Sequence, residues 1–230
     1  MADLRRRAIA EEQMDAADLA PEIYDAVLGD LARVNRLTMT ARPTLGFLER
    51  ALGEHKRFTL LDVGFGEGAM LRAIAHWASK RGIEAALTGV DLNPKSVSAA
   101  QQRTPDAMPI EYLAGDYAEL GDFDFIVSSL VAHHMTREQL VAFLRHMEAH
   151  SRIGWFVNDL HRQGFAHWGY PLLARIMGWH RIVREDGTLS IARSYRPGEW
   201  PPLLDEAGIA PGAARVFRAF PFKLCVERIR

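Results

Sequence analysis

The stretch F-T-L-L-D-V-G-F-G-E-G, residues 58–68, decides the fold of this chain. Its first half is an apolar run with β-branched residues, which favours a strand, and the A-M-L-R-A-I-A-H-W-A that follows favours a helix. The three glycines between them lack a Cβ, so a ligand can approach the backbone where the helix begins. We expect a cofactor at this glycine turn; the alternative is that the glycines only make a tight connection.

Two cofactors fit the spacing of the glycines. Gly64, Gly66 and Ala69 match G-x-G-x-x-A, the fingerprint of a dinucleotide site that holds a pyrophosphate at a helix N-terminus. However, Asp62 at the end of the strand would place a carboxylate beside that pyrophosphate and repel it. S-adenosylmethionine carries a sulfonium and an ammonium and no phosphate, so it suits an acidic strand end better.

Length and composition allow one α/β domain without selecting it. The chain has 230 residues, 48% of them hydrophobic and 25% charged, which is enough for one substantial domain and too few for two. A formal net charge of -1 offers no electrostatic attraction for DNA or RNA, so a nucleic-acid partner is disfavoured. The single Cys225 cannot form an intrachain disulfide, and its apolar surroundings favour a buried role over a nucleophilic one.

The first residues of the sequence do not have the pattern of a signal peptide. Three arginines within residues 1–7 are followed by acidic E-E-Q-M-D instead of an apolar core, so we expect no signal peptide. No apolar run approaches the roughly 18 residues that a membrane span needs. We therefore expect a cytoplasmic protein.

Strands and helices alternate along most of the chain. We predict strands at 60–63, 86–91, 110–114, 123–128 and 153–158, with helices at 21–37, 42–52, 69–80, 94–103, 137–150 and 198–207. This alternation predicts a doubly wound, Rossmann-like, mainly parallel sheet. Two closing strands, 214–219 and 222–227, are joined too tightly for a crossover, so they should pair antiparallel and complete seven strands.

The regions that flank this pattern should cover the sheet. Residues 1–56 should form an N-terminal helical cap and residues 57–230 the cofactor-binding domain, together one structural unit. Within the latter, residues 161–195 should be an inserted helix and loop rich in aromatic residues. The insert suits a lid over an apolar, ring-containing substrate, satellite core packing, or the surface of a homodimer.

Four motifs in order carry a family resemblance: L-L-D-V-G-F-G-E-G, G-V-D-L-N-P, A-G-D-Y and F-D-F-I-V-S-S-L-V-A-H-H. With them the chain resembles the class I S-adenosylmethionine-dependent methyltransferases, and within these the small-molecule branch that includes quinone-pathway enzymes. The resemblance covers about residues 58–159. It implies S-adenosylmethionine as the cofactor and S-adenosylhomocysteine as its product.

The resemblance also implies a role for each matched residue. Asp62 and the glycine turn would face the methionine part, and Asp91 would accept the ribose hydroxyls, a device that NAD sites share. Asp116 would accept the adenine amino group, although an ordinary capping role is its alternative. The full cofactor set that we expect is Asp62, Gly64, Phe65, Gly66, Gly68, Asp91, Leu92, Asn93, Asp116, Tyr117, Ser128 and Ser129.

Departures from other branches narrow the reaction. Metal-dependent catechol methyltransferases have a carboxylate at the end of the fourth strand, where this chain has Ser128 and Ser129, and Asn158 with Asp159 makes a poor magnesium site. The motifs of base-amino and arginine methyltransferases are absent. We therefore expect metal-independent transfer to a small molecule and no metal site.

Methyl transfer from a sulfonium needs mainly alignment, and a base helps when the acceptor is a phenol. His133 and His134 follow the fourth strand and His161 follows the fifth, at the sheet edge where ligands bind. These histidines favour an aromatic or polyketide-like hydroxyl as acceptor, while nitrogen or carbon acceptors stay open. The alternative for the pair is helix capping or packing. Two other functions remain open: a non-catalytic cofactor-binding regulator, and a nicotinamide oxidoreductase, which the absence of Y-x-x-x-K disfavours.

Overall fold

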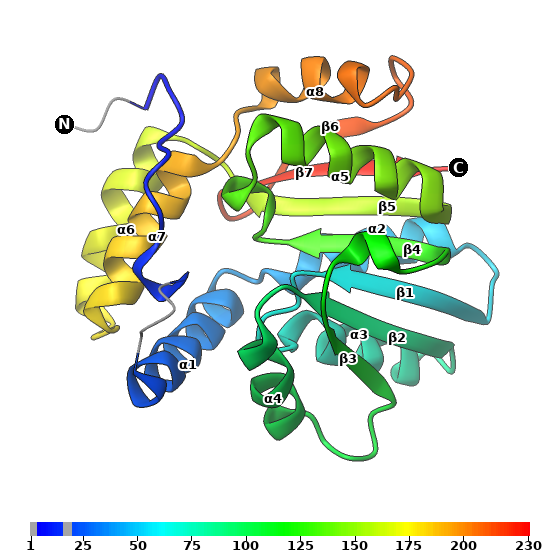
Figure 1. The fold of residues 1–230 in the computed structure, drawn as a ribbon, viewed down its shortest axis with the longest axis horizontal. Coiled ribbons are helices and arrows are strands. Elements are labelled where there is room, and N and C mark those ends of the chain that lie inside the picture. The colour runs from blue at the N-terminus through cyan, green and yellow to red at the C-terminus, as the bar shows by residue number, and fades with distance from the viewer. Residues whose placement is uncertain (1–3, 16–19) are drawn as a thin grey trace.

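The computed structural model describes residues 4–15 and 20–230. Within these residues, seven strands form one sheet in the order β3-β2-β1-β4-β5-β7-β6, with β7 antiparallel to its neighbours (Figure 1). The strands are β1 (Arg57–Val63), β2 (Glu84–Asp91), β3 (Ile110–Ala114), β4 (Phe123–Ser129), β5 (Ser151–Leu160), β6 (Arg215–Ala219) and β7 (Lys223–Ile229). This is the predicted Rossmann-like sheet with its antiparallel closing hairpin.

Helices cover both faces of the sheet. One face carries α2 (Ala41–Leu52), α3 (Ala69–Lys80) and α4 (Pro94–Arg103), and the other carries α5 (Arg137–His150) and α8 (Trp200–Glu206). On the first face Phe47 of α2 stacks on Phe156 of β5 with ring centroids 4.9 Å apart. On the second, Trp155 and Trp200 are fully buried. Burial on both faces explains why the central strands are continuous apolar runs.

The strand order reverses at β1. This strand pairs with β2 on one side and β4 on the other, so the chain leaves β1 and β4 toward opposite faces of the sheet. Ligands of open α/β sheets bind at such a reversal, beyond the carboxyl ends of the strands. The glycine turn follows β1 at this point.

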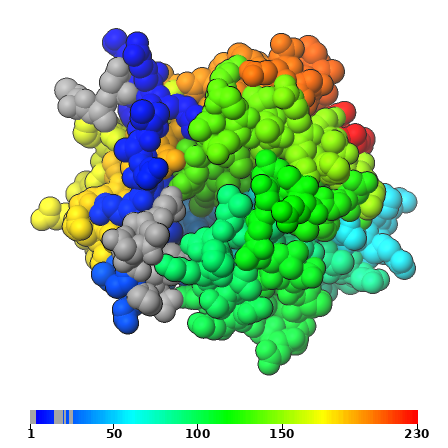
Figure 2. Space-filling model, viewed as in Figure 1, coloured from blue at the N-terminus to red at the C-terminus, as the bar shows by residue number. Residues whose placement is uncertain are grey.

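Three helices and the N-terminal segment form a cap beside the carboxyl ends of the strands, on the left of Figure 1. They are α1 (Pro21–Leu37), α6 (Gly164–Ile176) and α7 (Arg181–Arg193), with residues 4–15 running across them. Val27, Trp179 and Val183 form a small core within this cap. Figure 2 shows the N-terminal segment crossing the surface between the α6–α7 pair and α5. No helix in the described part of the chain is long and apolar enough to span a membrane.

The predicted helices at 21–37, 69–80, 94–103 and 137–150 have the bounds found in the structure. The prediction of one helix and a loop in the insert is wrong, because the insert folds into α6 and α7. Pro171 lies inside α6 and obscures the helical pattern, since proline usually ends a helix. Gly178 has φ +68°, a left-handed conformation that suits the connection between the two helices.

Candidate functional site

The glycine turn has the backbone that the sequence predicts. Gly64, Gly66 and Gly68 have φ values of +76°, +56° and +78°, a region that favours glycine. A Cβ at Gly64 would lie 2.4 Å from Cγ2 of Val131, so the turn packs tightly against the loop after β4. A Cβ at Gly66 would meet no atom within 4 Å, so the turn is open at this residue.

Asp62, the penultimate residue of β1, has a buried carboxylate oxygen without a hydrogen-bond donor among the described residues. The residue is 1% exposed, and its Oδ1 accepts no hydrogen bond from the described residues. Burial, together with the charge of Asp91, raises the pKa of Asp62 to about 7. A buried oxygen without a donor is costly, and a bound cation would offset that cost.

Asp91 ties the glycine turn to the next strand. Its two carboxylate oxygens accept the backbone N–H groups of Gly66 and Asn93, each at 2.9 Å. Leu92 is 78% exposed, and the Asn93 side chain caps α4 by accepting the N–H of Lys95. The structure thus brings these three predicted residues to the same sheet edge as the turn.

Asp116 and Tyr117 follow β3. Asp116 is exposed and caps a short helix, η2 (Tyr117–Glu119), by accepting the N–H of Ala118. Asp116 therefore fills the capping role that is the alternative to ligand binding. The ring of Tyr117 packs edge-on against Phe143 and His146 of α5. Partial burial raises the pKa of the Tyr117 hydroxyl.

The remaining predicted cofactor residues divide into packed and unpaired groups. The Phe65 side chain is buried and packs against Tyr112, so only its backbone lies at the turn. Ser128 donates its hydroxyl to the carbonyl of Val63, which joins the ends of β4 and β1. The buried hydroxyl of Ser129 has no hydrogen-bond partner among residues 4–15 and 20–230.

His133 is held firmly by Asp159 at the end of β5. His133 lies in η3 (Ala132–His134), two residues after Val131, and is only 3% exposed. Its backbone N–H and its Nδ1 each lie 2.7 Å from an oxygen of Asp159. Burial alone would raise the pKa of Asp159, but contacts with His133 and the N–H of Leu160 hold it below its ordinary value. The Asp159 carboxylate is placed to accept an Nδ1 proton, and in that tautomer Nε2 carries the lone pair.

Glu12 of the N-terminal segment completes this cluster. Its carboxylate lies 3.6 Å from Nε2 of His133 and 3.8 Å from Nε2 of His134. Glu12 is 5% exposed and accepts a 2.7 Å hydrogen bond from the hydroxyl of Ser190 on α7. Arg193, one turn further along α7, has its NH1 3.8 Å from Glu12 and donates to the carbonyls of both histidines.

His161 does not join the other two histidines in this cluster. Its backbone N–H donates to the carbonyl of Phe222 in the β6–β7 turn. Burial lowers the pKa of His161, and the charges of Arg218, Arg196 and Arg162 lower it further. The ring stays neutral in these surroundings, on the β7 side of β5.

The aromatic residues of the insert point in different directions. Trp179 is buried in the core of the cap, whereas Phe165 and Trp168 are 76% and 55% exposed on α6. Satellite packing therefore accounts for Trp179, while the Phe165 ring lies against Phe222 of the β6–β7 turn, with centroids 5.6 Å apart.

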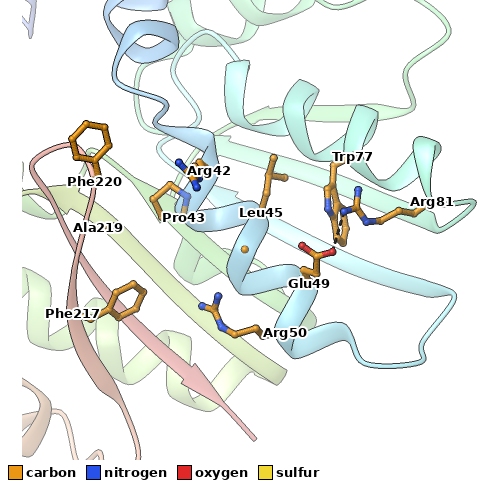
Figure 3. A pocket seen from close by; sticks show the side chains of 11 residues that line it. Arg42, Pro43, Leu45, Glu49, Arg50, Trp77, Arg81, Phe217, Ala219 and Phe220 are labelled. Carbon is orange, nitrogen blue, oxygen red and sulfur yellow. Dashed lines mark hydrogen bonds and ion pairs between the residues drawn. The ribbon is translucent and has the colours of Figure 1, made fainter.

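A groove of about 650 Å³ lies elsewhere, along the outer face of α2 between α3 and β6 (Figure 3). Two of its arginines are already paired: Arg50 with Glu227 at 2.5 Å, and Arg81 with Glu49 at 3.0 Å. The groove contains none of the predicted site residues. We therefore keep the candidate site at the carboxyl ends of β1, β2, β4 and β5.

Sequence reasoning missed two members of the site. Asp159 was weighed only as a magnesium ligand, although its place at the end of β5 could have suggested a partner for a histidine after β4. Glu12 lies in a segment without periodicity and 121 residues before His133, so no local signal could have found it.

Comparisons with known proteins agree with this architecture. Residues 60–154 match the family model of a methyltransferase domain. A comparison with curated proteins found no match.

Several solved structures share the fold. The plantazolicin methyltransferase BpumL in complex with SAH is 14% identical, with a TM-score of 0.66 over 92% of this chain and 91% of that one. Magnesium protoporphyrin IX methyltransferase from Synechocystis PCC 6803 with bound SAH is 16% identical, with a TM-score of 0.57 over 95% and 91%. A SAM-dependent methyltransferase from Aquifex aeolicus is 18% identical, with a TM-score of 0.55 over 80% and 88%. Residues 60–154 therefore match a methyltransferase domain, and the chain shares the class I fold of these S-adenosylmethionine-dependent methyltransferases.

Proposed function

We propose that this methyltransferase binds S-adenosylmethionine at the glycine turn and methylates a hydroxyl of a small aromatic or polyketide-like molecule, without a metal. The single observation that carries the cofactor assignment is the buried, unpartnered Oδ1 of Asp62 beside the open backbone of Gly66. An ammonium would supply the missing donor, and a pyrophosphate would not.

The residues around the turn suit the rest of the cofactor. The carboxylate of Asp91 is fixed by two backbone N–H groups and keeps lone pairs for two ribose hydroxyls. Leu92 offers an exposed apolar surface to a base edge. Asp116 already accepts the N–H of Ala118 to cap η2, so less of its carboxylate remains for an adenine amino group. We therefore propose a weaker role for it. When bound, the cofactor supplies an electrophilic methyl group on a sulfonium.

His133 is the base that this geometry favours. Asp159 holds its Nδ1 and its backbone, so Nε2 has a fixed direction, toward the carboxylate of Glu12, and carries a lone pair in the Nδ1–H tautomer. The loop that carries it packs against Gly64 through Val131, and this contact supports a base close to the glycine turn. Nε2 would take the proton of the acceptor hydroxyl as its oxygen bonds to the methyl carbon, while the carbon–sulfur bond breaks and its electron pair stays on sulfur. His134 is the second candidate and His161 the third.

The class of the acceptor molecule is supported by the fold relatives and by the chemistry of a base. Fold relatives are named for plantazolicin and for magnesium protoporphyrin IX, which supports a small-molecule or peptide acceptor. Tyr195 lies near His133 through Arg7, whose guanidinium is 3.8 Å from the Tyr195 ring centroid and donates to the carbonyl of His133. We favour an aromatic hydroxyl because a phenol gains most from a base.

Calorimetry with S-adenosylhomocysteine and with NAD tests the cofactor, and binding of NAD alone would refute the proposal. Release of S-adenosylhomocysteine, measured by mass spectrometry against a panel of phenols, quinone precursors and polyketides, then identifies the acceptor.

Asp159→Asn tests the base once an acceptor is known. An amide at this position no longer fixes the Nδ1–H form of His133, so kcat should fall at least tenfold while S-adenosylhomocysteine affinity holds. His133→Ala should behave alike, and His76→Ala on the exposed face of α3 is the matched control. Unchanged kcat in His133→Ala and His134→Ala would move the role to His161 or to alignment alone.

A further inference from the structure

Glu12, His133 and His134 offer three ligand atoms that converge on one point. The two Nε2 atoms and a carboxylate oxygen all lie within 4.8 Å of one another, and the closest separation is 3.6 Å. Zinc binds imidazole nitrogen and carboxylate oxygen at about 2.0–2.2 Å, so tetrahedral ligands stand roughly 3.4 Å apart. Side-chain movements of a few tenths of an ångström to about one ångström would complete the coordination.

The surroundings of the three side chains are those of a metal site. Metal-bound histidines commonly donate their second nitrogen to a carboxylate, as His133 does to Asp159 at 2.7 Å. The Glu12 carboxylate is itself held by the Ser190 hydroxyl at 2.7 Å. The His134 side chain is 31% exposed, so an ion has a path to the site and a place for a further ligand.

The ligand types select the metal. Two imidazoles and one carboxylate favour zinc and other late first-row ions over magnesium and calcium, which prefer oxygen ligands alone. Arg193, 3.8 Å from Glu12, is a cationic neighbour that opposes an ion. The carboxylates of Glu12 and Asp159 offset it, and Arg193 also donates to two backbone carbonyls of η3, which hold it in place.

We propose that Glu12, His133 and His134 bind one Zn²⁺, and that zinc inhibits methyl transfer by taking the Nε2 lone pair that the base requires. The inhibition rests on the proposed function, whereas the metal site does not. The sequence predicts no metal site, and the site proposed here includes Glu12 of the N-terminal segment, which no local pattern joins to the two histidines.

Zinc titration calorimetry and visible absorption of added Co²⁺, on the chelator-treated full chain, test the site. One ion per chain should bind, and Glu12→Gln and His134→Ala should each weaken Zn²⁺ at least tenfold. Asp159→Asn should weaken it roughly 10–100-fold through loss of the hydrogen bond to His133. His76→Ala is the control and should leave affinity unchanged, while S-adenosylhomocysteine binding and thermal unfolding verify that each variant is folded.

Equal zinc affinity in wild type, Glu12→Gln and His134→Ala would overturn the site, as would the absence of zinc binding. In activity assays, Zn²⁺ should lower kcat at least tenfold in wild type, and a chelator should restore it. If the chelator-treated enzyme is instead inactive and zinc restores turnover, the metal site stands, but the free-base role of His133 and zinc inhibition both fail. The direct binding measurement therefore separates failure of the site from failure of the proposed function.

Discussion

Asp62→Asn should stabilise the ligand-free protein at alkaline pH while it weakens cofactor binding. The wild-type carboxyl is buried, lacks a donor for Oδ1 and has its pKa raised from 3.8 to about 7. A raised pKa means that the folded state holds the proton more tightly than the unfolded chain does. The stability contributed by the protonated group is therefore complete below about pH 4 and is lost as pH rises through 7.

The magnitude follows from these two pKa values. Each pKa unit corresponds to 1.36 kcal/mol, so the raised pKa of Asp62 lowers the free energy of unfolding by about 2 kcal/mol at pH 5 and about 4 kcal/mol at pH 8. Asparagine has nearly the same shape and no charge, so its advantage should grow by about 2–3 kcal/mol between these pH values. In a chain of this size that is a relative Tm increase of roughly 5–10 °C.

Thermal unfolding of ligand-free wild type and Asp62→Asn at pH 5 and pH 8 measures this difference directly. Asp205→Asn, at an exposed carboxylate on α8, is the matched control and should unfold with wild type at both pH values. A Tm difference that is the same at pH 5 and pH 8, or an asparagine variant that is less stable at pH 8, would refute the reasoning. Calorimetry on the same samples should give at least tenfold weaker S-adenosylhomocysteine binding.

Three other outcomes are expected. S-adenosylhomocysteine affinity, measured by calorimetry, should fall as pH drops below about 7, because the ligand ammonium pairs with ionised Asp62; a flat profile would contradict this pairing. Gly66→Ala should keep the fold but weaken the same ligand at least tenfold, since its methyl group enters the open space at the turn; unchanged affinity would place the ligand elsewhere. Gly187→Ala should lower stability by about 1–3 kcal/mol in denaturant unfolding, because its Cβ would lie 2.4 Å from the Tyr170 ring. Gly169→Ala, in open space on the neighbouring helix, is its control and should stabilise by up to about 1 kcal/mol; equal effects of the two would refute the packing argument.

The parts of the structure that the sequence predicts are those with local signals. The strand at 60–63, the glycine turn and the helix at 69–80 follow from apolar runs, positive-φ glycines and helical spacing within 25 residues. The same holds for Asp91, whose place at a strand end follows from the alternation of elements. The split of the insert into two helices was harder, because Pro171 lies where a helix normally ends.

The histidine cluster depends on contacts that no local pattern records. His133 is predicted as a residue after β4, but its orientation comes from Asp159 on the adjacent strand and its neighbour Glu12 comes from the N-terminal segment. His161 looks equivalent in sequence, yet three nearby arginines and the β6–β7 turn give it different surroundings. Tertiary contacts of this kind decide which of several candidate bases is held in place.

The contacts of residues 4–15 with η3 and α7 affect how the site is assembled during synthesis. Arg7 donates to the carbonyl of His133 across 126 positions, and Glu12 meets Ser190 across 178. Residues 4–15 leave the ribosome before α7, but their docking surface exists only after α7 has been made. Contacts between such distant residues form late, because the intervening chain must first be ordered. A nascent chain that already holds the glycine turn would thus lack a finished histidine cluster until α7 emerges.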